Sequence, residues 1–187
     1  MANPAVTARR SADGGTLWLM RGVFAVLTLV LLVVQLLPLG LLPAGWVGPD
    51  LVFAFALVWV ARRPDFAPVW LLAGLFLLAD LLLQRPPGLW AAMALLATEA
   101  LRARAQDLRD MVFAGEWAIV AVILTGFTAA FLALWSLLVP YDIPRGLFAL
   151  QMLLTLAAYP PVAGASVALF GVTKAAPGQT DALGRKL

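Results

Sequence analysis

The chain of 187 residues contains no cysteine and no histidine. Without cysteine it can form no disulfide bond and can use no thiol chemistry. Without histidine it lacks the commonest general base and metal ligand, which excludes a serine–histidine dyad and a His-Glu-x-x-His zinc site. Walker loops, dinucleotide-binding fingerprints and the Gly-x-Gly-Asp element of intramembrane aspartyl proteases are absent as well. We therefore expect no enzyme, no cofactor, no metal site and no nucleic-acid partner.

Charged residues are scarce, at 12% of the chain, whereas hydrophobic residues make up 63%. A soluble domain usually carries about 25% charged residues, and it cannot cover so much apolar surface. Inside a bilayer each backbone polar group must be paired internally, which leaves helices or closed barrels. Barrel strands alternate apolar and polar residues, but here the apolar runs are continuous. The composition therefore predicts an all-α, multi-pass membrane protein.

The hydropathy pattern predicts six transmembrane helices, because a helix needs about 20 apolar residues to cross the hydrocarbon core. The expected spans cover residues of about 17–37, 46–61, 66–84, 88–101, 116–139 and 146–172. The first span follows basic residues but lacks a small-residue cleavage site, so we expect it to remain in the mature protein. The segments 1–16 and 173–187 are expected to be mobile tails. Residues from about 102 to 110 are expected to form an interfacial helix or a cytoplasmic docking ledge.

The distribution of basic residues predicts the orientation, because cytoplasmic loops are enriched in Lys and Arg. With the N-terminus inside, 11 of the 13 basic residues fall on the cytoplasmic side, and both termini are cytoplasmic. Only Arg85 and Arg145 fall outside. The localisation expected is the inner membrane of a bacterium. The cytoplasmic face should contact anionic lipid headgroups through its loop arginines, which are Arg62, Arg63, Arg102, Arg104 and Arg109.

Three carboxylates lie close to or within the apolar segments, where a charge is costly and needs a partner. Asp50 follows Pro49, so it is either a helix-start signal or a partner contact on the outer face. Asp80 is expected either to bond Gln84 or a neighbouring helix, or to make a functional contact. Asp50 and Asp80 should lie at one depth near the outer leaflet, where they form a polar cluster together with Arg85.

Two further features have simpler interpretations. Glu99 precedes Arg102 by three residues, and the two should form a local ion pair on one helix face. Pro160 and Pro161 should kink the last span, because proline removes a helical hydrogen bond.

The segment 49–88 carries a family resemblance. Pro49-Asp50-Leu51 opens a span that reaches Trp59 and is followed by Arg62-Arg63-Pro64. After it come Asp80-Leu81-Leu82 and a turn of Arg85-Pro86-Pro87-Gly88-Leu89. This resembles the MreD family of rod-shape-determining proteins, which is also similar in length and in its six-span layout. The sequence departs from the family pattern at two places. The glycine that the family has just before its aspartate is missing, and the nearest glycine before Asp80 is Gly74. Pro87 stands where the family has an aliphatic residue.

The resemblance implies a non-enzymatic scaffold of the bacterial cell-elongation machinery, which builds peptidoglycan and sets rod shape. The implied partners are MreC, MreB filaments, and RodA with its penicillin-binding transpeptidase. The implied fold is a compact bundle like the substrate-binding subunits of energy-coupling-factor vitamin transporters. The residues expected to bind a partner or form the polar cluster are Pro49, Asp50, Trp59, Asp80, Arg85, Pro86 and Gly88.

A solute-binding subunit of a small-molecule transporter remains the alternative function. It requires an outer pocket with convergent polar groups. The sequence offers a small set of neutral polar residues for such a pocket, namely Gln35, Gln84, Thr125, Thr128, Ser136, Gln151, Thr155 and Ser166.

Overall fold

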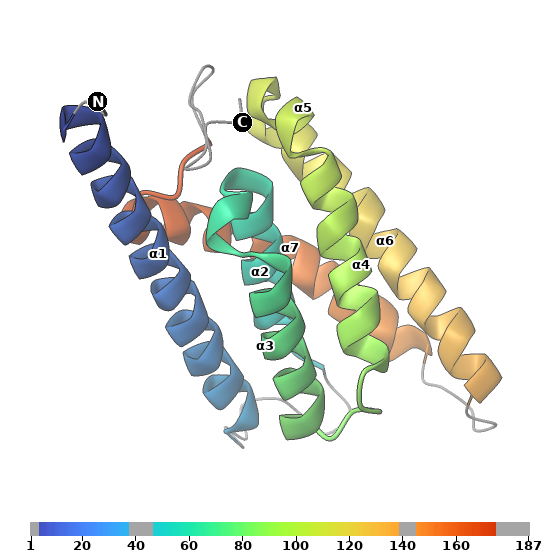
Figure 1. Ribbon diagram of the computed structural model, residues 1–187. Helices are drawn as coiled ribbons and strands as arrows, with labels where there is room; N and C mark the ends of the chain where they lie inside the picture. Colours follow the sequence, from blue (N-terminus) through green and yellow to red (C-terminus); the bar gives the residue numbers. More distant parts are fainter. Residues whose placement is uncertain (1–3, 38–46, 139–144, 175–187) are drawn as a thin grey trace.

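The computed structural model describes residues 4–37, 47–138 and 145–174, and the regular structure in these ranges is entirely helical (Figure 1). This confirms the all-α class. The elements are α1 (Pro4–Leu36), α2 (Leu51–Arg62), the 3₁₀ turn η1 (Pro64–Phe66), α3 (Val69–Leu82), α4 (Leu89–Ala103), α5 (Ala105–Asp110), α6 (Phe113–Leu138) and α7 (Arg145–Phe170).

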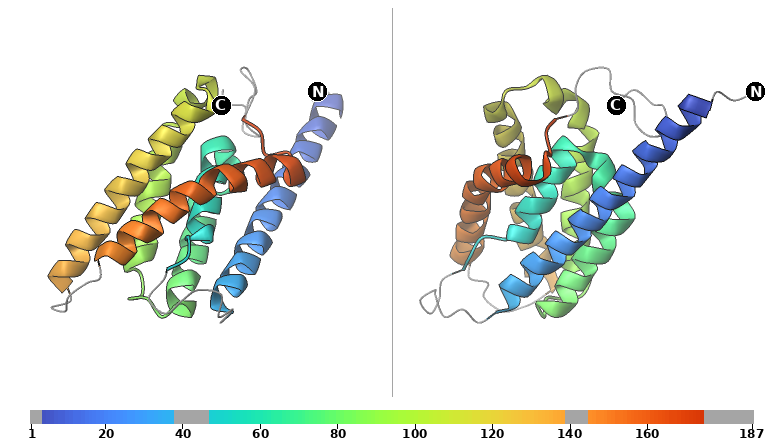
Figure 2. Two further views of the ribbon diagram at one scale, coloured as in Figure 1. Left: turned by 180° about the vertical axis from the view of Figure 1, so that it is seen from behind. Right: turned by 90° about the vertical axis from the view of Figure 1, so that its left-hand side faces the viewer.

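Helix α2 forms the centre of the bundle, and each of its residues from Val52 to Ala61 is buried. A helix that is apolar on all sides is stable only when it is surrounded. Helices α1, α4, α5 and α7 pack most closely against it, whereas α3 packs mainly on α1 and α4, and α6 packs mainly on α4 and α7 (Figure 2). Helices α3 and α6 each reach α2 through a ring contact with Phe53. The core of the molecule is therefore built around a single short helix.

Within the described ranges, three helices are long and apolar enough to cross a membrane. They are the part of α1 from Gly14 to Leu36, Phe113–Leu137 of α6, and α7. Each leaves large apolar side chains exposed on the surface of the bundle, such as Val26, Val122 and Leu169. Because lipid accepts such side chains and water does not, this surface indicates a multi-pass membrane protein, as the composition predicts.

Helices α2 and α3 are shorter than the expected spans 46–61 and 66–84, whereas α4 matches the expected span 88–101 to within two residues at each end. Helices α2, α3 and α4 have 12, 14 and 15 residues, which corresponds to about 18 to 22 Å, against about 30 Å for the hydrocarbon core. Prolines limit them: α2 begins only after Pro49, and α3 begins after Pro68. Successive main helices nevertheless run in opposite directions along the bundle, so that the start of α1 and the end of α7 lie in the same half (Figure 1).

The N-terminal segment differs from the expected tail, and most of the expected C-terminal tail lies outside the described residues. Helix α1 begins at Pro4, so most of the segment 1–16 is helical rather than a loose tail. Of the expected tail 173–187, only Thr173 and Lys174 lie within the described residues. The segment after Arg102 contains the expected short helix, α5, which buries Ala105 and Leu108.

Helix α7 continues through Pro160 and Pro161, which both lie in its interior. Figure 2 shows that the helix changes direction along its length. The two prolines therefore bend the helix without ending it.

Candidate functional site

Asp50 joins the start of α2 to α7. As the N-cap of α2, its Oδ1 accepts a hydrogen bond from the Phe53 backbone N–H at 3.0 Å. Its own backbone N–H donates to Oγ1 of Thr155 on α7 at 2.9 Å. An N-cap carboxylate satisfies a helix donor that has no partner within the helix and lies favourably in the field of the helix dipole. The helix-start interpretation of Asp50 is therefore correct, and Pro49 is the residue just outside the cap.

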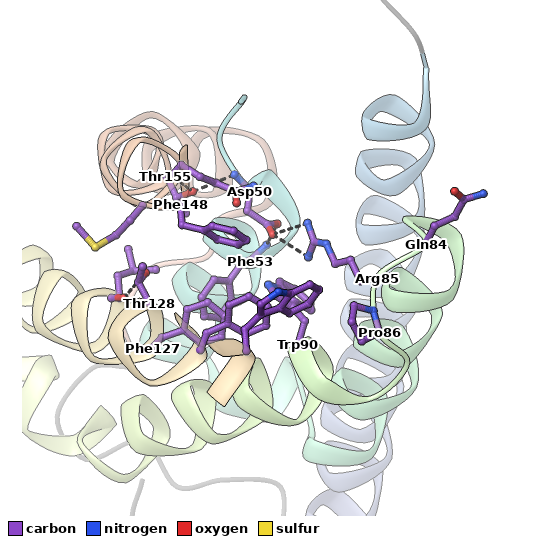
Figure 3. Close-up of a pocket in the computed structure, with 15 residues that line it drawn as sticks. Asp50, Phe53, Gln84, Arg85, Pro86, Trp90, Phe127, Thr128, Phe148 and Thr155 are labelled. Carbon is purple, nitrogen blue, oxygen red and sulfur yellow. Dashed lines mark hydrogen bonds and ion pairs between the residues drawn. The ribbon is translucent and has the colours of Figure 1, made fainter. Parts of the chain in front are cut away.

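Arg85 connects Asp50 to the turn between α3 and α4 (Figure 3). Both terminal nitrogens of Arg85 lie 3.3 Å from Asp50 Oδ2. Its guanidinium also lies over the Trp90 ring, 4.5 Å from the ring centroid. A flat guanidinium can make both contacts at once, because its edge donates hydrogen bonds while its face stacks.

The Asp80 side chain binds the backbone at the start of α4, on the buried side of the α3–α4 turn. Its Oδ2 accepts hydrogen bonds from the backbone N–H groups of Gly88 at 2.9 Å and Ala91 at 3.0 Å, and the residue is fully buried. These donors belong to the first turn of α4, which Asp80 caps from α3. Gly88 has a φ of +86°, a left-handed conformation that glycine adopts without strain. Of the two structural expectations for Asp80, the bond to a neighbouring helix is the one found.

The expected polar cluster of Asp50, Asp80 and Arg85 is thus organised around one turn. The Arg85 side chain pairs with Asp50, whereas Asp80 binds the backbone of the same turn. Gln84, which carries a positive φ of 54°, points away from this group of side chains (Figure 3). The two acids therefore hold the α3–α4 turn from two sides, one through a side chain and one through the backbone.

A pocket of about 190 Å³ opens beside the Asp50–Arg85 pair, and we call it the Asp50 pocket (Figure 3). It lies among α2, the α3–α4 turn, α4, α6 and α7. Its lining residues are Asp50, Phe53, Gln84, Arg85, Pro86, Trp90, Leu124, Phe127, Thr128, Phe131, Trp135, Phe148, Gln151, Met152 and Thr155. Of the polar residues expected for a solute site, Gln84, Thr128, Gln151 and Thr155 line the pocket, whereas Ser166 is buried elsewhere on α7 and Thr125 is exposed on α6.

Trp59 does not belong to this site. It is fully buried nearer the other end of α2, where its ring packs against those of Phe24, Phe55 and Phe170 at centroid distances of 5.2 to 6.2 Å. Its contribution is to the aromatic core between α1, α2 and α7. The structure therefore separates Trp59 from the expected polar cluster of Asp50, Asp80 and Arg85.

The arginines expected on the cytoplasmic face lie at the opposite end of the bundle from Asp50. Arg63 donates to the Thr173 carbonyl at 3.0 Å, and Arg102 donates to Glu99 at 2.9 Å and to the Pro64 carbonyl at 2.8 Å. The Glu99–Arg102 pair is confirmed. Arg104 is exposed, whereas Arg109 is only partly exposed, as are Arg62, Arg63 and Arg102.

Glu116, which the sequence pattern does not single out, organises that same end. It is fully buried, and its Oε1 accepts from the Tyr159 hydroxyl at 2.7 Å and from Arg62 Nε at 3.1 Å. Lys174 Nζ lies 3.1 Å from Oε2 and also donates to the Leu108 and Met111 carbonyls. The side-chain partners of Glu116 lie 43 or more residues away from it in the chain, so no local sequence pattern reveals this cluster.

Among the described residues, no group of three or more His, Cys, Asp or Glu side chains is placed to hold a metal ion. Searches for matching protein-family models, curated proteins and solved structures find no match to this chain.

Proposed function

We propose that this chain is a non-enzymatic scaffold of the bacterial cell-elongation machinery that binds MreC in the inner membrane. In this proposal it spans the membrane six times, with both termini in the cytoplasm. Its further partners are MreB filaments, and RodA with its penicillin-binding transpeptidase. The fold in the proposal is that of the substrate-binding subunits of energy-coupling-factor transporters.

The alternating helix directions support the six-span topology. The short helices α2, α3 and α4 cross the bilayer in this proposal because their neighbours and the flanking turns shield their polar ends from lipid. The arginines at the Glu116 end then face the cytoplasm, and the Asp50 end faces outward.

The observation that carries the proposal is the convergence of four residues from the segment that carries the family resemblance. Asp50, Asp80, Arg85 and Gly88 are spread over 39 positions of the chain, yet they meet at the α3–α4 turn through the hydrogen bonds and ion pair described above. A motif that builds one rigid turn at the end of a bundle presents a defined surface to a partner. In that turn, Gln84 and Pro87 are exposed.

The proposal is tested by purifying the tagged full-length chain in mild detergent and identifying its companions by mass spectrometry. We expect MreC among them. The double variant Gln84→Glu, Pro87→Glu changes only exposed positions of the turn and should reduce MreC recovery at least about tenfold, because a desolvated charge in an interface is costly. The matched control, Arg104→Glu with Gln106→Glu, changes exposed positions at the other end and should leave recovery unchanged. Absence of MreC from the native preparation contradicts the proposal, and undiminished recovery with the turn variant contradicts the assigned surface.

The Asp50 pocket favours a second candidate, a solute-binding subunit of a small-molecule transporter. Ligand sites are concave, largely apolar and carry a few placed polar groups, and the pocket has this character. The same purification separates the candidates, since a transporter subunit should recover an ATP-binding transport module in place of MreC.

A further inference from the structure

The walls of the Asp50 pocket are predominantly aromatic. Six aromatic side chains from four helices line it, namely Phe53, Trp90, Phe127, Phe131, Trp135 and Phe148. Their rings contact one another, with centroids 4.7 Å apart for Phe53 and Phe127 and 5.6 Å apart for Phe131 and Phe148. Rings attract a further ring through edge-to-face and offset contacts, beyond the gain from buried area. The walls therefore favour an aromatic guest over an aliphatic one.

The pocket is large enough for one aromatic ring. The pocket holds about 190 Å³, and an apolar cavity of about 150 Å³ in another protein accommodates benzene. One ring with a small substituent therefore fits in the pocket.

The charges that line the pocket balance each other. Among the described residues, Asp50 and Arg85 are the only charged ones that line the pocket, and they pair with each other at 3.3 Å. Asp50 also accepts from Phe53, and Arg85 also stacks on Trp90. A charged ligand would lose its hydration without meeting a free counter-ion, which is costly. The balance therefore favours a neutral ligand.

Apart from Gln84, whose side chain points away from the Asp50–Arg85 pair (Figure 3), we consider two polar lining groups with hydrogen-bonding capacity, Gln151 and Thr128. Within the described part of the chain, the Gln151 side-chain amide has no hydrogen bond, so it offers both a donor and an acceptor. The Thr128 hydroxyl donates to the Leu124 carbonyl at 2.9 Å, which leaves its oxygen free to accept. A ligand that both donates and accepts, as a carboxamide does, complements these two groups.

We propose that the Asp50 pocket binds a neutral, single-ring aromatic molecule that carries a carboxamide or a similar donor–acceptor group. The ring is enclosed by the six aromatic side chains, and the polar substituent meets Gln151 and Thr128. This inference concerns the purified chain alone and holds whether the chain is a scaffold or a transporter subunit.

The probe for this site is 4-fluorobenzamide, followed by ¹⁹F NMR with the full-length protein in detergent. We expect the probe signal to broaden in the presence of protein and not with empty micelles. Unlabelled benzamide should restore the sharp signal, whereas benzoate and cyclohexanecarboxamide should not, because one carries a charge and the other lacks the aromatic ring. Competition by benzoate or by lauric acid as strong as that by benzamide would overturn the assigned ligand class.

Two threonines of α6 supply a matched pair of variants. Thr128 lines the pocket and Thr125 is exposed, yet each hydroxyl makes the same bond to the carbonyl four residues earlier, at 2.9 and 2.8 Å. We expect Thr128→Phe, which fills the pocket, to abolish broadening, and Thr125→Phe to leave it unchanged. Gln151→Leu should weaken binding about tenfold, the loss of a well-placed hydrogen bond. Equal broadening with all three variants, each checked for a cooperative thermal transition, would place the probe elsewhere and refute the proposal.

Discussion

At the scale of single residues, the buried carboxylates of Asp50 and Asp80 near the α3–α4 turn differ in their hydrogen-bond partners. Asp50 divides its oxygens between a backbone donor and the Arg85 cation. Asp80 directs one oxygen at two backbone donors of α4. The first arrangement stabilises a charge, whereas the second chiefly satisfies N–H groups that would otherwise be buried without a partner.

The Asp80 arrangement leads to a prediction about which property of the side chain matters. Asp80→Leu leaves the Gly88 and Ala91 N–H groups unpaired and should lower the free energy of unfolding by about 2–5 kcal/mol. Asp80→Asn keeps an acceptor oxygen and removes a buried charge, so it should be close to native. The measurement is thermal unfolding of the purified protein in detergent.

The control for this prediction is Glu99→Leu, on the neighbouring helix. Glu99 is partly exposed and pairs with Arg102 at 2.9 Å, and such pairs contribute about 0–1 kcal/mol. If Asp80→Leu costs no more than Glu99→Leu, the turn does not depend on the Asp80 hydrogen bonds.

At the scale of elements, α7 shows how a helix tolerates two internal prolines in an apolar setting. Because Pro160 has no N–H, the Leu156 carbonyl loses its helical donor. The indole Nε1 of Trp117 on α6 donates to that carbonyl at 3.1 Å. A side chain of a neighbouring helix thus restores the hydrogen bond that the proline removes, as the absence of water in lipid requires.

A double-mutant cycle tests whether the Trp117 indole N–H replaces the backbone N–H that Pro160 lacks. Trp117→Phe should destabilise the protein by about 1 kcal/mol, the value of a typical hydrogen bond. In a Pro160→Ala background, residue 160 regains an N–H aimed at the Leu156 carbonyl, so Trp117→Phe should cost less than half as much. Thermal unfolding of the four proteins gives the coupling energy.

The adjacent proline provides the matched control. Pro161→Ala restores a donor to the carbonyl of Ala157 and not to that of Leu156, so the cost of Trp117→Phe should remain the same in this background. Equal costs in all three backgrounds would show that Trp117 contributes packing alone.

The elements that the sequence predicts best are those determined by composition over many residues. The long apolar runs of α1, α6 and α7 were predicted because hydropathy sums over whole spans. Helices α2 and α3 are predicted too long, because the expected spans include residues before Leu51 and Val69 that Pro49 and Pro68 keep out of the helices. The polar partners of Glu116 and the pocket depend on contacts between distant segments, which periodicity cannot register.

At the scale of the whole molecule, the bundle has two chemically different ends. One end carries the Asp50–Arg85 pair, the Asp80-capped turn and the aromatic pocket. The other carries the buried Glu116 cluster together with Arg63, Arg102, Arg104 and the amphipathic helix α5. Because α2 lies at the centre and is almost wholly buried, both ends are attached to one rigid element. The proposed orientation assigns these ends to opposite sides of the membrane.

The absence of cysteine makes this orientation directly measurable, because a single introduced thiol is the only one in the chain. Pro87 in the α3–α4 turn and Gln106 in α5 are both exposed and lie at opposite ends of the bundle. In spheroplasts treated with a membrane-impermeant maleimide, we expect Pro87→Cys to be labelled at once and Gln106→Cys only after the membrane is permeabilised. The reverse pattern would invert the topology and place the Asp50 pocket in the cytoplasm, which removes it from any periplasmic partner. In the proposed topology, α4 is the one span between these two positions. Labelling of both variants without permeabilisation would place both positions outside and would mean that α4 does not cross the bilayer.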